Sequence, residues 1–392
     1  MPPWLVARCT FQVHEKRLDI HLDFPAGSVF TCAACGRDGC KVHDTTERTW
    51  RHLNFFEHET YLHARLPRTE CPDCGVKTVA VPWAREGSGF TLLFEAFVMT
   101  LAKEMPVNAI ARLVQEHDTR IWRILHHYVE QARAAQDYSQ VQELGIDETS
   151  RRRGHNYITV FVDLRESKVL FVTEGKDAGT LGTFSEDLRR HNGHSSQIQE
   201  VCCDMSPAFI SGVEETFPQA PLTFDKFHVM KIINEAVDEV RRLEQATCPE
   251  LKKSRYLWLK NQVNLTQKEQ TKFESLKELN LKTARAYHLK LNFQEMYQQP
   301  PELADTYLKK WYFWATHSRL QPMLKAAKTI KRHWAGVLRW FKSRITNGVL
   351  EGINSLIQAA KAKARGYRST KNLVTMVYLI AGKLDLRLTH TI

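Results

Sequence analysis

Leu144-Gly-Ile-Asp-Glu-Thr149 opens the stretch of sequence that decides the fold, because its apolar residues alternate as in a half-buried strand. Two runs of strand composition follow, Tyr157-Ile-Thr-Val-Phe-Val162 and Lys168-Val-Leu-Phe-Val-Thr173, and polar turns separate them. A helix is expected over residues 179–191, and a fourth strand over residues 198–203. This order predicts a mixed sheet that begins with a three-stranded meander.

Two acidic residues occupy comparable places in this predicted sheet. Asp147 lies on the first strand, and Asp204 directly follows the fourth strand. If these two strands are neighbours, both carboxylates lie at one end of the sheet. Because paired carboxylates repel each other, we expect a divalent cation between them, and oxygen ligands of this kind suit Mg²⁺ or Mn²⁺.

A third carboxylate has to come from a distant segment. Residues 347–365 form the best-patterned helix of the chain, with one apolar and one polar stripe. The apolar stripe is Leu350, Ile353, Ile357, Ala360 and Ala364, and the polar stripe is Asn347, Glu351, Asn354, Gln358, Lys361 and Arg365. Glu351 is the only acid on the polar stripe, and Asn354 follows it one turn later. A plain amphipathic helix with a solvated polar face fits the same pattern.

Cysteines cluster near the amino terminus in two CxxCG motifs, Cys32-Ala-Ala-Cys35-Gly and Cys71-Pro-Asp-Cys74-Gly. Each CxxC turn places two thiolates on one side of an ion, so two turns supply the four ligands of a tetrahedral Zn²⁺. We expect Cys32, Cys35, Cys71 and Cys74 to hold a structural Zn²⁺ with no open position for catalysis, and a hairpin to fill the long gap between the motifs. Two unrelated cysteine pairs are the alternative. The roles of Cys40 and His43 stay open.

Helical spacing of apolar residues predicts helices over residues 90–105, 107–115 and 119–131. The last of these carries Arg120 and Arg123 near its start, on a face away from its apolar residues. A short helix, a tight turn and a helix with basic residues near its start are typical of a helix-turn-helix, in which those residues contact DNA. An ordinary three-helix core with a solvated basic face fits the same residues.

Composition limits the class of protein. A chain of 392 residues suggests two or three domains, and 43% hydrophobic residues supply a core for each. A net charge of +11 favours a polyanionic partner, with nucleic acid as the default. The sequence has neither a secretory signal nor an apolar run long enough for a membrane span, so we expect a soluble intracellular protein without a membrane partner.

Several short motifs occur together and in a specific order. They are the two CxxCG motifs with Trp50-Arg-His-Leu53 between them and Pro82-Trp-Ala84 after them, then Gly145-Ile-Asp-Glu148, Cys203-Asp-Met-Ser-Pro-Ala-Phe209, Phe224-Asp-Lys-Phe-His-Val229, Asn347-Gly-Val-Leu-Glu-Gly-Ile-Asn354 and Ala364-Arg-Gly-Tyr-Arg368. With these motifs the chain resembles, over nearly its whole length, the transposases of the ISL-three insertion-sequence family.

The resemblance implies a multidomain α/β protein. An RNase H-like catalytic domain with a mixed sheet and a helical insertion would be preceded by a zinc-binding module and a helix-turn-helix. We place the zinc-binding module at residues 1–88, the helix-turn-helix DNA-binding domain at 89–138, the catalytic domain at 139–228 and 346–392, and the insertion at 229–345.

The resemblance also implies the activity, that of an Asp-Asp-Glu DNA transposase. Asp147, Asp204 and Glu351 would bind two Mg²⁺ or Mn²⁺ ions for in-line displacement at phosphorus. Water as the nucleophile gives a nick at the end of the insertion sequence, and the freed 3′-hydroxyl gives strand transfer into a target. Lys361 and Arg365 are candidates to hold phosphates.

Further expectations concern partners and location. We expect double-stranded DNA, both transposon ends and target, as the partner, a homodimer on DNA, and a place in the cytoplasm of a prokaryotic cell at the nucleoid. Asp225-Lys-Phe-His228 matches a (Cys/Asp)-x-x-His element of several such families, and the role of His228 stays open.

Two other functions stay open from the sequence: an RNase H-like nuclease that cuts without joining, and a non-catalytic DNA-binding regulator. Strand-transfer products would exclude the first, and metal-dependent cleavage would exclude the second.

The insertion carries Trp258, Trp311, Trp314, Trp334 and Trp340. Aromatic residues can stack on unpaired bases, but packing of a helical bundle explains most of these tryptophans better.

Overall fold

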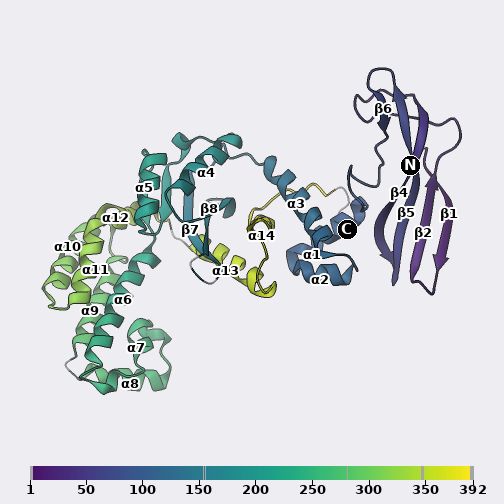
Figure 1. Ribbon diagram of the computed structural model, residues 1–392. Coiled ribbons are helices and arrows are strands. Elements are labelled where there is room, and N and C mark those ends of the chain that lie inside the picture. The colour runs from purple at the N-terminus through teal and green to yellow at the C-terminus, as the bar shows by residue number, and fades with distance from the viewer. Residues whose placement is uncertain (1–2, 153, 155, 280, 346–347, 389–392) are drawn as a thin grey trace. The chain divides into compact units, whose positions relative to one another are not determined.

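The protein forms two compact units, each with its own sheet (Figure 1). The computed structural model describes residues 3–152, 154, 156–279, 281–345 and 348–388. The first unit consists of the described residues in 1–134, 360–367 and 384–392, and the second of those in 135–359 and 368–383. The boundaries of the four parts expected from the sequence stay a prediction. Within the described ranges, no helix has the length and apolar character of a membrane span.

A six-stranded sheet forms the amino-terminal part of the first unit. Its strands are β1 (Leu5–Gln12), β2 (Arg17–Asp23), β3 (Val29–Phe30), β4 (Cys40–Phe55), β5 (His58–Cys71) and β6 (Gly75–Thr78), in the order β1-β2-β5-β4-β3 with β6 on β5. β4 and β5 form the expected hairpin between the CxxCG motifs, with Lys41 opposite Glu70 near one end. β4 begins at Cys40, shortly after the first CxxCG motif, and β5 ends at Cys71, where the second motif begins. The hairpin therefore brings the second motif back beside the first.

Three helices follow the sheet, as the sequence predicts. They are α1 (Leu92–Glu104), α2 (Val107–Leu113) and α3 (Asp118–Ala134). The Thr91 side chain caps α1 by accepting a hydrogen bond from the Phe94 backbone N–H, and Pro106 precedes the first turn of α2. Ile110, Ile121 and Leu125 are fully buried, so the apolar stripes of the three helices form one core.

A buried carboxylate ties the helices to the segment that precedes them. Glu95 of α1 has no solvent exposure. Its oxygens accept hydrogen bonds from Arg85 Nε at 3.0 Å, Ser88 Oγ at 2.7 Å and the Tyr128 hydroxyl of α3 at 2.9 Å. Because the Glu95 carboxylate accepts all three of these hydrogen bonds, the network fixes α1 and α3 relative to the connecting segment.

The second unit is built on the predicted mixed sheet. Its strands are β7 (Glu143–Arg152), β8 (Asn156–Asp163), β9 (Lys168–Glu174), β10 (Glu200–Cys203) and β11 (Leu222–Phe224), in the order β11-β10-β7-β8-β9. The β7-β8-β9 meander is antiparallel, whereas β10 runs parallel to both β7 and β11. Helices α4 (Gly179–Arg190) and α5 (Pro207–Thr216) flank β10 in the sequence, with a 3₁₀ turn at Ser195–Gln197. β7 is therefore the central strand.

A bundle of helices follows β11. It contains α6 (Lys226–Glu244), α7 (Arg255–Leu259), α8 (Gln267–Lys277), α9 (Lys282–Met296), α10 (Pro301–His317), α11 (Gln321–Arg332) and α12 (Trp334–Ser343), with 3₁₀ turns at Pro249–Leu251 and Gln262–Asn264. Trp258 and Trp311 are fully buried, and Trp340 is 8% exposed. Trp334 donates from Nε1 to Asp305 Oδ1 at 2.8 Å, and only Trp314, at 43% exposure, opens widely to solvent. Packing therefore explains most of these tryptophans, as the sequence suggested.

The last two helices return to the sheets. They are α13 (Gly348–Lys363) and α14 (Thr370–Ala381). The Tyr378 hydroxyl of α14 accepts a hydrogen bond from the Val172 backbone N–H of β9 at 3.1 Å, which fixes α14 on the edge strand. The end of α13 belongs to the first unit, where Lys363 Nζ donates to the Glu104 carbonyl at the end of α1 and Tyr367 contacts Trp122 of α3.

Candidate functional site

The four predicted zinc ligands converge. The sulfurs of Cys32, Cys35, Cys71 and Cys74 all lie within 4.8 Å of one another, and Cys35 Sγ is 3.6 Å from Cys71 Sγ. Four thiolates about 2.3 Å from one Zn²⁺ in a tetrahedron would have sulfurs roughly 3.8 Å apart. The donor set and its spacing therefore fit a structural Zn²⁺, and the alternative of two unrelated cysteine pairs is wrong.

Backbone amides favour the thiolate form of one of these cysteines, Cys71. The N–H groups of Asp73 and Cys74 point at the Cys71 sulfur and lower the pKa of that thiol to about 7, against the effect of desolvation. Cys40 is buried beside the cluster, where its thiol contacts the Arg37 carbonyl, and desolvation raises its pKa. His43 instead pairs with Asp44 on the surface. Both residues lie outside the four-ligand set.

The two arginines predicted to contact DNA differ in their surroundings. Arg120 Nη1 donates to Glu116 Oε2 at 2.5 Å, and its guanidinium lies 4.3 Å from the Phe90 ring centroid. Arg123 is exposed and has no hydrogen-bond or ion-pair partner within the described residues. Arg123 is therefore the arginine that α3 leaves available for a ligand.

Asp147 lies on β7, and Asp204 directly follows the neighbouring strand β10. β10 pairs with β7 in parallel, with Cys202 opposite Gly145, so continuing the register by two residues brings Asp204 level with Asp147. Asp147 is only 7% exposed. Asp204 Oδ1 accepts a hydrogen bond from the Ser206 backbone N–H at 2.9 Å, at the start of α5. The register therefore places Asp204 beside Asp147, and the Asp204 charge acts on the Asp147 carboxylate.

Helix α13 lies along β7, and one side chain per turn contacts the strand. Leu350 lies over Gly145, where a methyl group on the glycine would come within 2.8 Å of Leu350 Cδ1. Asn354 Nδ2 donates to Asp147 Oδ2 at 2.7 Å, and Gln358 Nε2 donates to Thr149 Oγ1 at 2.7 Å. Each step of four residues along α13 therefore corresponds to two residues along β7, so the helix and the strand stay in register over these three contacts. The polar stripe of α13 bonds the sheet, so the alternative of a solvated face is wrong for Asn354 and Gln358.

The electrostatics tie four polar residues into one site. The pKa of Asp147 is raised to about 6, first by burial and also by the Asp204 charge, against the opposing effects of the Glu148 N–H and His228. The pKa of His228 is raised, first by its hydrogen bond to Asp225 and then by the charges of Asp147, Asp225 and Asp204, against burial. His228 Nδ1 is 3.1 Å from Asp225 Oδ2. The charges of Asp147 and Asp204 therefore act on His228 of the Asp-x-x-His element, whose role the sequence left open.

Glu351 lies in the first turn of α13, one turn before Asn354, and it is exposed. Throughout the described ranges, the four cysteines are the only group of three or more metal-ligating side chains close enough to hold an ion. The three acids are not gathered so tightly, which is expected for carboxylates that repel one another. Lys361 and Arg365 fall in residues 360–367 of the first unit, and Asn347 lies outside the described residues.

Oxygen donors around Asp147 suit a hard divalent cation. The Asn354 side-chain oxygen is buried and receives no hydrogen bond in the described part of the chain. Such an orphaned oxygen next to the Asp147 carboxylate has the chemistry of a ligand for Mg²⁺ or Mn²⁺, which take oxygen ligands. Asp147, Asp204 and Asn354 therefore fit the cation that the sequence implies, and Glu351 is within the same helix turn.

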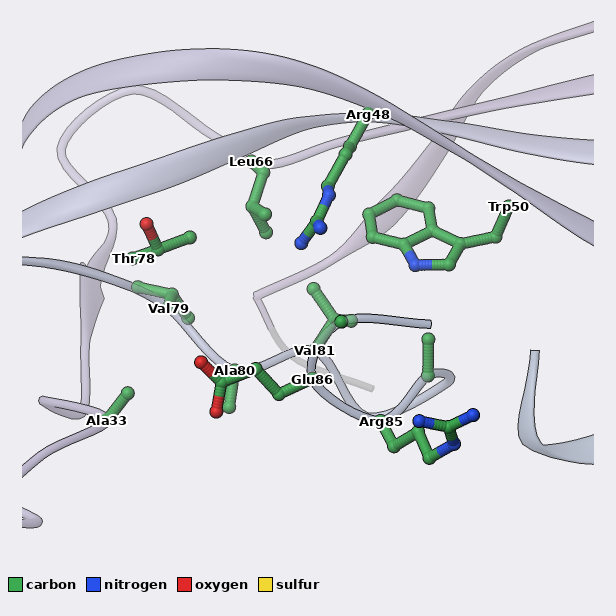
Figure 2. Close-up of a pocket in the computed structure, with 12 residues that line it drawn as sticks. Ala33, Arg48, Trp50, Leu66, Thr78, Val79, Ala80, Val81, Arg85 and Glu86 are labelled. Carbon is green, nitrogen blue, oxygen red and sulfur yellow. The ribbon is translucent and has the colours of Figure 1, made fainter. Parts of the chain in front are cut away.

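A cavity of about 270 Å³ lies elsewhere, in the first unit. Arg48 and Trp50 of β4 line one wall, and the segment from Val79 to Val81 lines another (Figure 2). Its lining contains none of the carboxylates discussed above. The cavity lies between the sheet and the segment that leads to Arg85. Its size alone does not make it the site of DNA cleavage.

Comparisons with known proteins identify the family of the chain. The family described as Transposase in the ISL3 group matches residues 144–377, the helix-turn-helix domain of transposase family ISL3 matches residues 79–129, and the zinc finger of transposase IS204/IS1001/IS1096/IS1165 matches residues 28–74. The transposase for insertion sequence element IS1557 of Mycobacterium tuberculosis is 28% identical over 382 residues, which cover 89% of this chain and 85% of the relative. The transposase for insertion sequence element IS1001 of Bordetella parapertussis is 28% identical over 363 residues, covering 90% and 89%. The chain, with its zinc cluster, helix-turn-helix and mixed-sheet domain, belongs to the ISL3 family of insertion-sequence transposases.

Proposed function

We propose that this transposase cuts the ends of an insertion sequence and joins them to target DNA, using Asp147, Asp204 and Glu351 at one metal site. The observation that carries the proposal is the hydrogen bond from Asn354 to Asp147 at 2.7 Å. It supports the assignment because it anchors the turn of α13 that contains Glu351 beside the buried aspartate, although 204 residues separate Glu351 from Asp147 in the sequence.

The residues of the site have distinct roles in this proposal. Asp147, Asp204 and Glu351 hold the metal ions, and Asn354 fixes the orientation of the Asp147 carboxylate. Two bound Mg²⁺ or Mn²⁺ ions would activate the attacking oxygen and stabilise the leaving oxygen of an in-line displacement at phosphorus. Because such a site recognises the phosphodiester, water and a 3′-hydroxyl can both serve as nucleophile.

Substitution of each acid tests the assignment. Asp147→Ala, Asp204→Ala and Glu351→Ala should each abolish Mg²⁺-dependent cleavage of the element's ends, with end binding retained in a gel-shift assay. Glu186→Ala, on the exposed face of α4, is the matched control and should cleave normally. A variant of the three that still cuts at the normal rate removes its residue from the site.

Joining is tested separately from cutting. Pre-nicked ends with a free 3′-hydroxyl, incubated with a supercoiled plasmid and Mg²⁺, should give covalent end–plasmid products that the Asp147→Ala protein does not form. Cleavage without joined products would favour a nuclease, and absence of both activities would favour a DNA-binding regulator.

We further propose that the parts expected at residues 1–88 and 89–138 recognise the ends, and that two chains act together because an insertion sequence has two ends. Mass measurement of the protein on a paired-end DNA should give two chains per complex. One chain per complex under conditions that support cleavage would contradict the homodimer.

A further inference from the structure

A groove of about 770 Å³ runs between α6 and α7 in the second unit. It starts beside the Asp225-x-x-His228 element, since Phe227 of that element lines it. The other lining residues are Met230, Lys231, Asn234, Glu235, Asp238, Arg241, Arg242, Arg255 and Leu259. One end of the groove therefore lies at the residue that directly precedes His228 in α6.

The groove is positively charged. Four cations and two acids line it. Asp238 is shared by three arginines, with Nε atoms of Arg241, Arg242 and Arg255 at 2.7, 3.7 and 3.4 Å from its oxygens. Lys231 forms no ion pair within the described part of the protein. Since one carboxylate cannot neutralise three guanidinium groups, the groove favours a polyanion.

Phe227 gives this charged groove an aromatic end. Phe227 is 61% exposed, whereas Val229, two residues later in α6, is fully buried. Its ring centroid lies 6.2 Å from that of His228. Asn234 stands farther along the groove, and its side-chain oxygen receives no hydrogen bond within the described residues. An exposed ring and an amide between cations are the groups that bind a nucleotide.

We propose that this groove binds one unpaired nucleotide of the DNA strand next to the cleaved phosphate, with its base stacked on Phe227. A paired base shows only its edges, so the face of the ring can be used only by a base that has left the duplex stack. Lys231, Arg242 and Arg255 would contact the flanking phosphates. The inference rests on the proposed function, because it defines the form in which the substrate enters the same site.

The unpaired base is tested without cleavage, on the full-length protein with Ca²⁺ in place of Mg²⁺. Duplex ends carry 2-aminopurine at successive positions around the cleavage point. Wild type should raise the fluorescence severalfold at one position, and Phe227→Ala should remove most of that rise while the dissociation constant changes less than about threefold. Phe313→Ala, an exposed ring on α10, is the matched control and should behave as wild type. No rise at any position with wild type, or an equal rise with Phe227→Ala, would overturn the proposal.

Cleavage in Mg²⁺ supplies a second readout. Phe227→Ala should cut a paired end at least tenfold more slowly, and a mismatch at the position found with 2-aminopurine should restore most of the rate. Equal slowing on paired and mismatched ends would show that Phe227 only supports the structure and would overturn the proposal. If wild type cuts no end, the proposed function fails, whereas the Ca²⁺ experiment still tests whether the groove binds an unpaired base.

The charge of the groove is tested with a fluorescent single-stranded oligothymidine. Lys231→Glu should weaken its binding at least fivefold at low salt, and Lys272→Glu on α8 makes the same charge change away from the groove. Equal effects of the two substitutions would mean that general attraction, and not the groove, holds the strand, and a groove that serves a protein partner would leave both affinities unchanged. Either outcome contradicts the proposal.

Discussion

At the scale of single residues, Asn354 shows how a neutral side chain organises a charged site. Its Nδ2 holds the buried Asp147 carboxylate, and its oxygen is left without a donor. A second carboxylate at this position would add repulsion to a group whose pKa burial already raises to about 6. An amide supplies an oxygen for a cation on one side and a hydrogen-bond donor for the aspartate on the other.

Arg120 and Arg123 should separate stability from DNA recognition. Arg123→Ala should weaken binding to the element's ends by roughly 5- to 100-fold and affect random DNA less, since a base contact by arginine contributes about 1–3 kcal/mol. Arg120→Ala should instead lower stability by about 1 kcal/mol, because the nearly buried Glu116 loses its nearest cation. Gel shifts on both DNAs and thermal unfolding measure the two effects. Equal loss on end and random DNA with Arg123→Ala would mean that it contacts only phosphate.

Lys290 predicts a pH dependence of stability. This lysine is 1% exposed, its Nζ donates to the carbonyls of Trp258 and Leu259 at 3.0 and 2.8 Å, and burial lowers its pKa to about 8. Between pH 8 and about 10.4 the unfolded chain holds more protons than the folded one, so stability rises with pH in that range. The gain is on the order of 1–3 kcal/mol.

The matched variant for this prediction is Lys290→Met, which keeps the length of the side chain and removes the titrating group. Urea unfolding at pH 7.5 and 10 should show a smaller increase in the free energy of unfolding for the variant than for wild type. Parallel pH curves for the two proteins would mean that Lys290 titrates as it does in the unfolded chain.

At the scale of elements, the pairing of α13 with β7 depends on a close approach at Gly145. A methyl group there would come within 2.6 Å of Leu164 Cδ2 and 2.8 Å of Leu350 Cδ1. Gly145→Ala should therefore cost about 1–3 kcal/mol by overpacking and slow cleavage strongly, because it pushes on the helix that carries Glu351. Gly352, in the same helix, has no atom within 4 Å of an added methyl group.

Gly352→Ala is thus the control, and it should raise stability by about 0.5–1 kcal/mol because alanine favours a helix interior. Denaturant unfolding and end cleavage measure both variants. If Gly145→Ala cleaves as fast as wild type, the position of α13 on β7 does not matter for the reaction.

The positions of strands and helices were the part of the structure that the sequence predicted best. Alternating apolar residues indicated the strands of the second sheet, and helical spacing indicated α13, because both patterns report burial directly. The partners of single side chains were beyond such reasoning. That Glu116 in a turn would hold Arg120, or that Gln358 would bond Thr149, depends on neighbours that only the folded chain brings together. The apolar spacing of α6 did not indicate a role for Phe227 either, because an apolar residue on the exposed face of an amphipathic helix does not follow that spacing.

At the scale of the whole molecule, the two units have different sources of stability. The first holds the four-cysteine cluster, and its sheet has only small hydrophobic clusters and an exposed β1, so a bound Zn²⁺ adds directly to folding. The second has a large continuous core that joins the mixed sheet to the helical bundle. Its candidate cation site lies on the central strand β7 and consists of polar side chains, which add little to the apolar core.

These differences predict two separable responses to metal. Calorimetry of the full chain should show two unfolding transitions, as expected for two compact units. A zinc-selective chelator should lower only the first unit's transition, and Cys71→Ser should have the same effect without chelator. Mg²⁺ should raise only the other transition, by RT ln(1 + [Mg²⁺]/Kd), or roughly 2.7 kcal/mol at a concentration 100-fold above Kd. Asp147→Ala should abolish this increase, because the variant lacks the central ligand of the proposed site. An Mg²⁺ effect that survives in Asp147→Ala would place the ion elsewhere in the protein, even if that variant no longer cuts DNA.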